Sequence, residues 1–382
     1  MLDPAVVPNL AGRLRLARRD QRMTQEEAAS ALSVARTTIV AIEKGERQVR
    51  PEELRAFARI YNRPLDEFLR SSAPVEELGA QFRMVLPKVE QEPELAAAVR
   101  QVERLVEDSV ELERLAEVAP RFRYPPEASI VGVDPETAAG EYAQSERGRL
   151  GLGDAPISRL RDVLEASVGA RVFALTLPSN VGGLFAFDER AGACIAFNNT
   201  HPYERQQMTL AHEYGHLLVS RHTADVNFVD PRARRSPAER FAHAFAYEFL
   251  LPSSSVIRHF NDVKRSRAGS VTVANLVELA LVLSVSVEAL FRRLEALKLI
   301  STGTYERARH QGLRVADAQR ALGLQPPAPD DRLLPTGYTT LAINAFQEGK
   351  ITEGLFARFL RLDRLEARRL AVELDGGPGP LD

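Results

Sequence analysis

Residues 209–219 read TLAHEYGHLLV, a pattern that predicts one largely apolar α-helix. His212 and His216 stand four positions apart in it, so both imidazoles lie on one helix face and can reach a single metal ion. Glu213 follows the first His and points towards the open coordination position, where it can take a proton from water. Two His and one Glu at this spacing are typical of a zinc peptidase.

The alternative is a chance occurrence of this motif on a buried helix. Histidine is scarce, with seven in the chain, yet His212, His216 and His222 fall within eleven positions. The flanking residues are apolar on the side that we expect to face inward. This clustering favours the metal site.

Two His residues need a third protein ligand, which normally lies farther along the chain. His222 fits the metzincin spacing, but Val219 stands where that motif has the glycine that turns the chain back. Glu239 opens a second predicted helix, whose apolar face can pack on the first, and His243 lies one turn beyond it. Because Glu239 also completes a capping box that begins at Ser236, residue chemistry alone leaves its role open.

A small α+β unit is predicted around these two helices. Strands are expected at 171–177, 183–187 and 193–197, with a turn at 188–192 that joins the last two as a hairpin. Helices are expected at 135–150, 156–167 and 237–251, and residues 257–300 are largely helical.

The first 70 residues predict five short helices. Thr24 and Glu27 form a capping box at the start of the second helix, and Gly45 ends the third, at 35–44. Apolar residues in this segment can form a small core, and Glu43 is expected to be an internal salt-bridge partner.

An outer face of the third helix is suited to a DNA major groove. Gln25 begins the second helix, where its side chain and the helix dipole both favour a phosphate. Residues 1–70 hold 13 Lys and Arg against 10 Asp and Glu, while the whole chain has a net charge of −2, so DNA binding must be local. The alternative is a helical bundle for protein contacts. The predicted DNA-binding residues are Gln25, Arg36, Thr37, Thr38 and Lys44.

Composition excludes several classes of protein. The single cysteine, Cys194, excludes an internal disulfide and a Cys-type zinc cluster. No N-terminal apolar segment resembles a signal peptide. The apolar stretch at 274–291 is interrupted by Glu278 and Glu288, which argues against a membrane span. We therefore expect a soluble, cytoplasmic protein.

The segments outside these two units carry no recognisable chemistry. Residues 93–119 predict a long charged helix whose heptad pattern is broken at Ser109 and Glu113, so it packs on the body of the protein or pairs with a second copy. Helices are also expected at 341–349 and 351–374, before a disordered tail.

Several motifs make the central unit resemble the ImmA/IrrE family of bacterial zinc metallopeptidases over about residues 125–300. They are ERQQMTLAHEYGHLL at 204–218 and E-x-x-A-x-x-F-A-x-x-F-L-L-P at 239–252. The resemblance implies that Glu239 is the third zinc ligand. Tyr214 and Met208 depart from the residues usual in the family, and neither touches the metal chemistry.

The N-terminal stretches MTQEEAA at 23–29 and VARTTIVAIEKG at 34–45 are similar to the phage-repressor, or XRE, type of helix-turn-helix. The two resemblances together imply a regulator that binds double-stranded DNA and a zinc-dependent endopeptidase that cleaves a protein in a stress or mobile-element response. The expected substrate is a helix-turn-helix repressor. The expected partners include a second copy of the chain, and no membrane partner is expected. The alternatives are a transcription factor with a non-catalytic sensor domain and an antitoxin-like partner-binding protein.

The sequence thus predicts a multidomain, mainly α protein with a small α+β core. The expected parts are a five-helix helix-turn-helix domain at 1–70, a linker with a long charged helix at 71–125, a zincin-like metallopeptidase domain with a small antiparallel sheet at 126–300, and a helical C-terminal region at 301–382.

Overall fold

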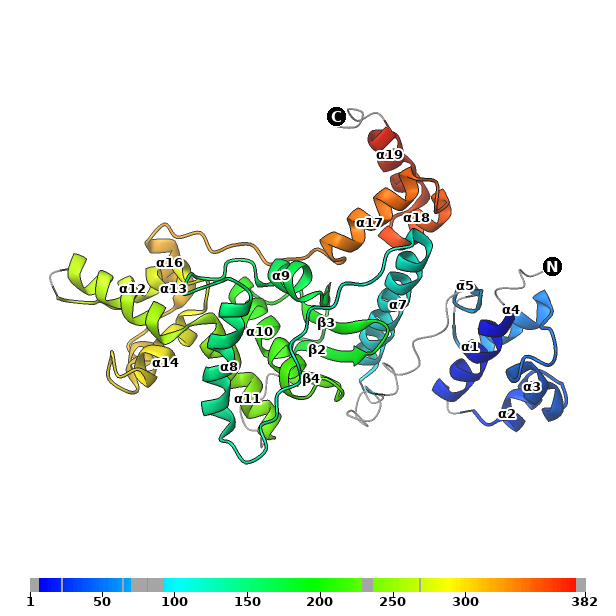
Figure 1. Ribbon diagram of the computed structural model, residues 1–382, viewed down its shortest axis with the longest axis horizontal. Helices are drawn as coiled ribbons and strands as arrows, with labels where there is room; N and C mark the ends of the chain where they lie inside the picture. Colours follow the sequence, from blue (N-terminus) through cyan, green and yellow to red (C-terminus); the bar gives the residue numbers. More distant parts are fainter. Residues whose placement is uncertain are drawn as a thin grey trace.

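A computed structural model describes residues 7–21, 23–63, 65–69, 81, 92–228, 236–267 and 269–375. N-terminal helices, a central body built on one sheet and a C-terminal helical group follow one another along the chain (Figure 1). The expected linker at 71–74 and the expected disordered tail after 375 lie outside the described residues.

The N-terminal helices form as the sequence predicts. The capping box of Thr24 and Glu27 is present, and Gly45 ends the third helix with a φ of +74°. Leu14, Ile39 and Ile42 are buried in their common core. The five helices are α1 (Val7–Asp20), α2 (Gln25–Ala31), α3 (Arg36–Glu43), α4 (Pro51–Ile60) and α5 (Leu65–Phe68).

The body is built on a mixed sheet with the strand order β1-β3-β2-β4. The predicted hairpin of β2 and β3 is confirmed, and Asp188 accepts backbone hydrogen bonds from Arg190 and Ala191 in its turn. The sequence predicts a small antiparallel sheet. The observed sheet is mixed, because β3 pairs with β1 in parallel. The strands are β1 (Arg171–Leu175), β2 (Val181–Asp188), β3 (Gly192–Asn198) and β4 (Asp225–Phe228).

Alternate residues of the strands serve two separate cores. Phe173 and Leu184 face α7 (Pro93–Ala116), the long charged helix, whereas Val172 and Phe185 face the helices on the other side. Those helices are α10 (Tyr203–Val219), α11 (Pro237–Leu250) and α8 (Pro135–Arg149), followed by α12 (Ser253–Ser266), α13 (Val273–Val282) and α14 (Val287–Ala296). The short helix α9 (Leu160–Val163) continues into a π-helical turn, η2 (Leu164–Val168).

Helix α7 packs on the body of the protein, which was one of the two predicted arrangements. The two polar residues that break its heptad have structural partners there. The Glu113 carboxylate receives two hydrogen bonds, of 2.7 and 2.9 Å, from Arg171 of β1, and the Ser109 hydroxyl donates to the carbonyl of Leu105. The same helix meets the N-terminal domain through a buried ion pair of 3.0 Å between Glu107 and Arg13.

Three C-terminal helices pack on the far end of α7: α17 (Thr336–Gln347), α18 (Glu353–Leu360) and α19 (Arg364–Asp375). The two helices before them, α15 (Thr304–His310) and α16 (Val315–Ala321), pack instead on α14 and α13 of the body. The single helix predicted at 351–374 is wrong, because Arg361 adopts a left-handed φ of +59° and separates α18 from α19. Its guanidinium hydrogen-bonds to the fully buried Asp108 of α7, which holds the break in place.

No single helix among the described residues is long and apolar enough to cross a membrane. The pair α13 and α14 passes by length and composition only when taken together, and it is bent by 105°.

Close contact between α10 and α11 depends on a glycine inside the metal motif. A Cβ atom at Gly215 would lie 2.7 Å from the Cα atom of Ala242. Phe241, Phe245 and Phe249 of α11 are fully buried, as predicted for its apolar face. The glycine therefore sets the distance between the two helices.

We expect Gly215→Ala to lower the free energy of unfolding by about 1–3 kcal/mol, because α11 must move away from α10. Gly148→Ala is the matched control: it lies on α8 with nothing within 4 Å of an added Cβ, and should be neutral or stabilise by up to about 0.5 kcal/mol. Urea unfolding measures both. Equal stability of the two variants would contradict the tight packing.

Candidate metal centre and nucleic-acid interface

The His pair and Glu213 lie on α10, beneath the sheet and well inside the body. His212, Glu213 and His216 are exposed by 7, 0 and 3%. The two Nε2 atoms are 3.1 Å apart, so both rings point to one place, as the four-residue spacing predicts. The Ser220 hydroxyl lies 3.1 Å from Nδ1 of His216 and holds that ring with Nε2 facing the partner His.

Glu239 reaches this pair from the first turn of α11. Its two carboxylate oxygens lie 3.0 Å from Nε2 of His216 and 3.7 Å from Nε2 of His212. Its backbone N–H donates to the Ser236 hydroxyl at 3.2 Å, so the backbone is capped while the carboxylate points to the His pair. Only the Ser236 half of the predicted capping box is therefore present, because the Glu239 carboxylate turns to the His pair and not back to the Ser236 backbone.

The two other candidates lie elsewhere. The side chain of His222 is 60% exposed and lies 3.9 Å from the Glu127 carboxylate. The ring of His243 stacks on Tyr247, with centroids 5.1 Å apart. Neither belongs to the group of potential metal ligands that the described residues form.

A fourth residue, Asp225, joins the group and was not predicted. Ligand atoms of His212, His216, Asp225 and Glu239 all lie within 4.8 Å of one another, and Oδ2 of Asp225 is 3.5 Å from Nε2 of His216. Asp225 begins β4, a strand too short and too rich in Asp and Asn to be recognised from the sequence. Its pairing with Phe185 of β2 brings the side chain to the centre.

The centre concentrates negative charge. Burial alone would lower the pKa of His216, but its hydrogen bond to Glu239 and the nearby Asp225 and Glu213 raise it to about 9. Burial and the charge of Asp225 raise the pKa of Glu213 well above its usual value. Burial also raises the pKa of Asp225, to about 6, whereas contact with His216 overcomes burial and lowers that of Glu239 to about 2.

These residues fit a divalent metal. Ligands about 2.0–2.1 Å from a tetrahedral zinc lie about 3.3 Å apart, and the distances between the ligand atoms quoted above are 3.0–3.7 Å. A cation would offset the excess of carboxylates. The Glu213 carboxylate is fully buried and does not belong to the group of clustered ligands.

Metal binding should release protons at neutral pH. A ligand must be deprotonated to bind, and a His216 with a pKa near 9 carries a proton at pH 7 in the metal-free protein. Affinity should therefore rise between pH 6 and 9. Calorimetry of zinc binding in buffers of different ionisation enthalpy measures the released protons, and the absence of release at pH 7 would contradict these electrostatics.

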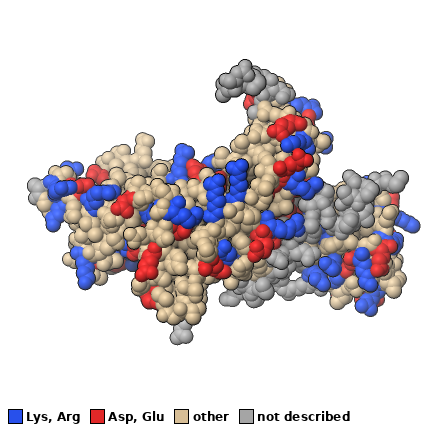
Figure 2. All heavy atoms as spheres, in the orientation of Figure 1, with Lys and Arg blue, Asp and Glu red and all other residues tan. Residues whose placement is uncertain are grey.

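The predicted DNA-reading face is solvent-exposed on α3. Arg36, Thr37 and Lys44 are exposed, and Thr38 is half-buried. On the face shown in Figure 2, basic and acidic side chains are interspersed over the N-terminal helices, which fits a modest local charge. The prediction for Glu43 is confirmed, since its carboxylate receives two hydrogen bonds from Arg18, of 2.6 and 2.9 Å.

Gln25 is the first residue of α2, as predicted, but its side chain is engaged inside the domain. The amide donates to the Glu43 carboxylate at 2.9 Å. The structure therefore does not leave the Gln25 amide pointing outward for the predicted phosphate contact.

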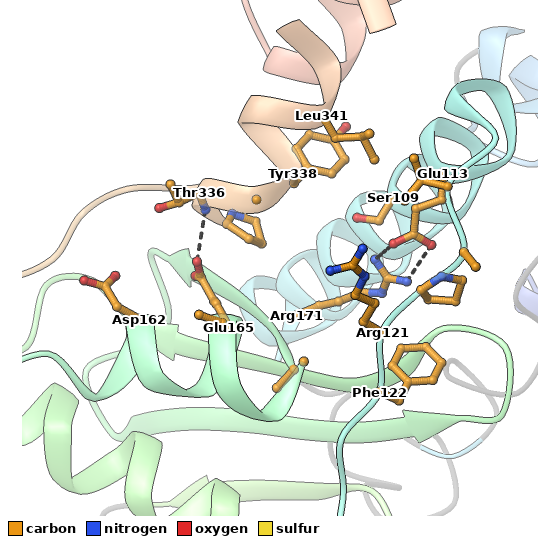
Figure 3. Close-up of a pocket in the computed structure, with 18 of the residues that line it drawn as sticks. Ser109, Glu113, Arg121, Phe122, Asp162, Glu165, Arg171, Thr336, Tyr338 and Leu341 are labelled. Carbon is orange, nitrogen blue, oxygen red and sulfur yellow. Dashed lines mark hydrogen bonds and ion pairs between the residues drawn. The ribbon is translucent and has the colours of Figure 1, made fainter. Parts of the chain in front are cut away.

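A cavity of about 720 Å³ lies away from the metal group, where α7, η2 and α17 meet (Figure 3). The ion pair of Glu113 and Arg171 lines one side, and Glu165 accepts a hydrogen bond of 3.0 Å from the backbone N–H of Thr336 on the other. Arg161 holds the incoming loop by donating to the carbonyls of Arg332 and Leu334. The cavity thus marks the junction of the body with the C-terminal helices.

Comparison with known families agrees with both parts of the chain. Residues 165–295 match the model of peptidase family M78, described as the IrrE N-terminal-like domain, and residues 14–68 match a helix-turn-helix model. Peptidases of the first family are metal-dependent. No curated protein matches the chain significantly.

Proposed function

We propose that this chain, which joins an XRE-type helix-turn-helix domain to an IrrE-type peptidase domain, is a DNA-binding regulator with a zinc-dependent endopeptidase centre. The observation that carries the proposal is the convergence of His212, His216 and Glu239 on one point beside a buried Glu213. The proposed functional units are residues 1–70, 71–125, 126–300 and 301–382. Because its DNA-binding domain must reach DNA, we place the protein in the cytoplasm.

In this proposal His212, His216 and Glu239 hold the metal. A zinc ion there supplies a Lewis acid for a peptide carbonyl. Glu213 takes a proton from the attacking water and returns it to the leaving amine.

A glycine of β2 packs closely against Glu213. A Cβ atom at Gly183 would lie 2.7 Å from the Thr209 side chain and 3.0 Å from Oε1 of Glu213. A larger residue at this position would therefore displace the proposed base.

The proposed substrate is a helix-turn-helix repressor, and the response is one to stress or to mobile elements. To test this, the zinc-loaded chain and its Glu213→Gln variant are incubated with purified repressors from the same cell. The Asp225→Ala variant is tested alongside them, because it removes the fourth member of the group. We expect one or a few defined cuts by chains that keep Glu213, abolished by a chelator. Cuts of equal rate with Glu213→Gln would contradict the proposal, and so would the absence of cuts by both the wild type and Asp225→Ala in all of the cell's helix-turn-helix repressors.

A non-catalytic sensor or an antitoxin-like module was the alternative from the sequence. The match to a peptidase family and the retained Glu213 do not favour it, because a sensor needs metal ligands but no buried base.

DNA recognition is assigned to the exposed face of α3. A domain with a charge of about +3 binds DNA weakly, so we propose that two copies act together on half-sites about one helical turn apart. Arg36→Ala should weaken the free energy of DNA binding by about 1–3 kcal/mol and reduce the sequence preference at one base pair. Lys44→Ala should weaken binding to all sequences and lower the salt slope by about one.

Gel shifts with the chain's own promoter and with random duplex, at several salt concentrations, measure both effects. Absent or salt-insensitive binding by a folded domain would leave residues 10–70 as a protein-contact module.

A further inference from the structure

The strand β4 brings a carboxylate to the metal group from the sheet. Val226 is buried in the core on the α7 side, so its neighbour Asp225 faces the opposite side, where α10 lies. Oδ2 of Asp225 is 3.5 Å from Nε2 of His216, close to the separation of about 3.3 Å expected between two ligands of one tetrahedral zinc.

Three protein ligands leave zinc an open position, and four close it. Resting on the metal site proposed above, we propose that Asp225 is a fourth protein ligand and that the centre of this structure is closed to water and substrate. The peptidase is then latent, and its opening requires Asp225 to leave.

Asp225 comes from the least anchored of the elements that supply ligands. The His pair lies on a buried helix of 17 residues, and Glu239 on one of 14. By contrast β4 has four residues, lies at the edge of the sheet, and pairs with β2 through an irregular register between Val181 and Gly183. A short edge strand next to a bulge is the element that separates most easily.

Glu213 distinguishes a reversibly closed centre from a structural metal site. A structural site gains nothing from a further carboxyl that is fully buried and is not one of the clustered ligands, because burying a carboxylate costs free energy. A catalytic site that opens has a use for it. The combination of a closing Asp225 and a retained Glu213 therefore points to latency.

Movement of β4 away from β2 would have two effects. It would remove Asp225 from the metal group, and it would expose the edge of β2, along which an extended peptide can pair as an added strand. The edge of β2 passes Glu213 at Gly183, so a peptide bound there lies beside the base.

The test uses the full chain loaded with Co²⁺, whose visible absorption reports its ligands, and thiocyanate as a probe of an open position. We expect thiocyanate to leave the wild-type spectrum unchanged. The spectra of Asp225→Ala and of the nearly isosteric Asp225→Asn should shift when thiocyanate is added. Chelator should extract the metal about tenfold or more faster from both variants. Glu127→Gln, which removes a carboxylate beside His222, is the matched control and should behave as wild type.

If the wild-type spectrum shifts with thiocyanate as strongly as those of the variants, and the metal is extracted at equal rates, Asp225 is not a fourth ligand. The proposed function would be unaffected by that result. Failure of the proposed metal site has a different signature: the wild type binds no Co²⁺, or His216→Ala leaves its spectrum unchanged.

Discussion

His216→Ala should leave the purified chain with roughly a tenth or less of the metal that the wild type carries after dialysis. His216 lies close to every other member of the group, because ligand atoms of His212, Glu239 and Asp225 are all within 3.5 Å of its Nε2 atom. Its loss removes one ligand and leaves carboxylates facing a cavity. Elemental analysis by mass spectrometry measures the metal content.

His222→Ala is the matched control, because it removes a histidine six positions along the chain that lies outside the group. It should retain full metal. The double variant His212→Ala, Glu239→Ala removes ligands from both helices and should be empty. Full zinc occupancy in the double variant would show that the site is assigned to the wrong residues.

Glu213→Gln should lower the rate of substrate cleavage by ~10²-fold or more and leave the metal content unchanged. The amide has the same shape but cannot take a proton, and Glu213 is not placed to be one of the four clustered ligands. Single-turnover cleavage of the identified repressor, with wild type and variant at equal zinc occupancy, measures the effect. Equal cleavage rates would show that Glu213 is not the general base. Loss of zinc from the variant would show instead that Glu213 helps to hold the metal ligands in place.

The sequence predicts most of this centre because its signals are local. The spacing of His212 and His216 and the capping residues around α2 and α11 depend only on neighbours within one or two helical turns. Predicting the position of Glu239 required one further step, namely that two apolar helix faces pack together. The spacing of Phe241, Phe245 and Phe249 indicates the apolar face of the second helix.

Asp225 could not be predicted, because its role depends on a long-range pairing. Nothing local marks Asp-Val-Asn-Phe as a strand, and its partner Phe185 lies 40 positions earlier. The parallel pairing of β1 and β3 was missed for the same reason, since the hairpin turn at Asp188 is local but the return of β3 to β1 is not. The helix break at Arg361 could not be predicted, because no sequence pattern marks an arginine with a positive φ. Its partner Asp108 lies in a helix that is distant in sequence.

The central claim, a metal held between α10 and α11, is tested most directly by anomalous diffraction from crystals of the zinc-loaded chain, with data on both sides of the zinc absorption edge. The account predicts one strong peak about 2.0–2.2 Å from Nε2 of His212, Nε2 of His216 and one carboxylate oxygen of Glu239. A strong zinc peak elsewhere in the chain, or well-ordered density for these three side chains with no peak between them, would contradict it.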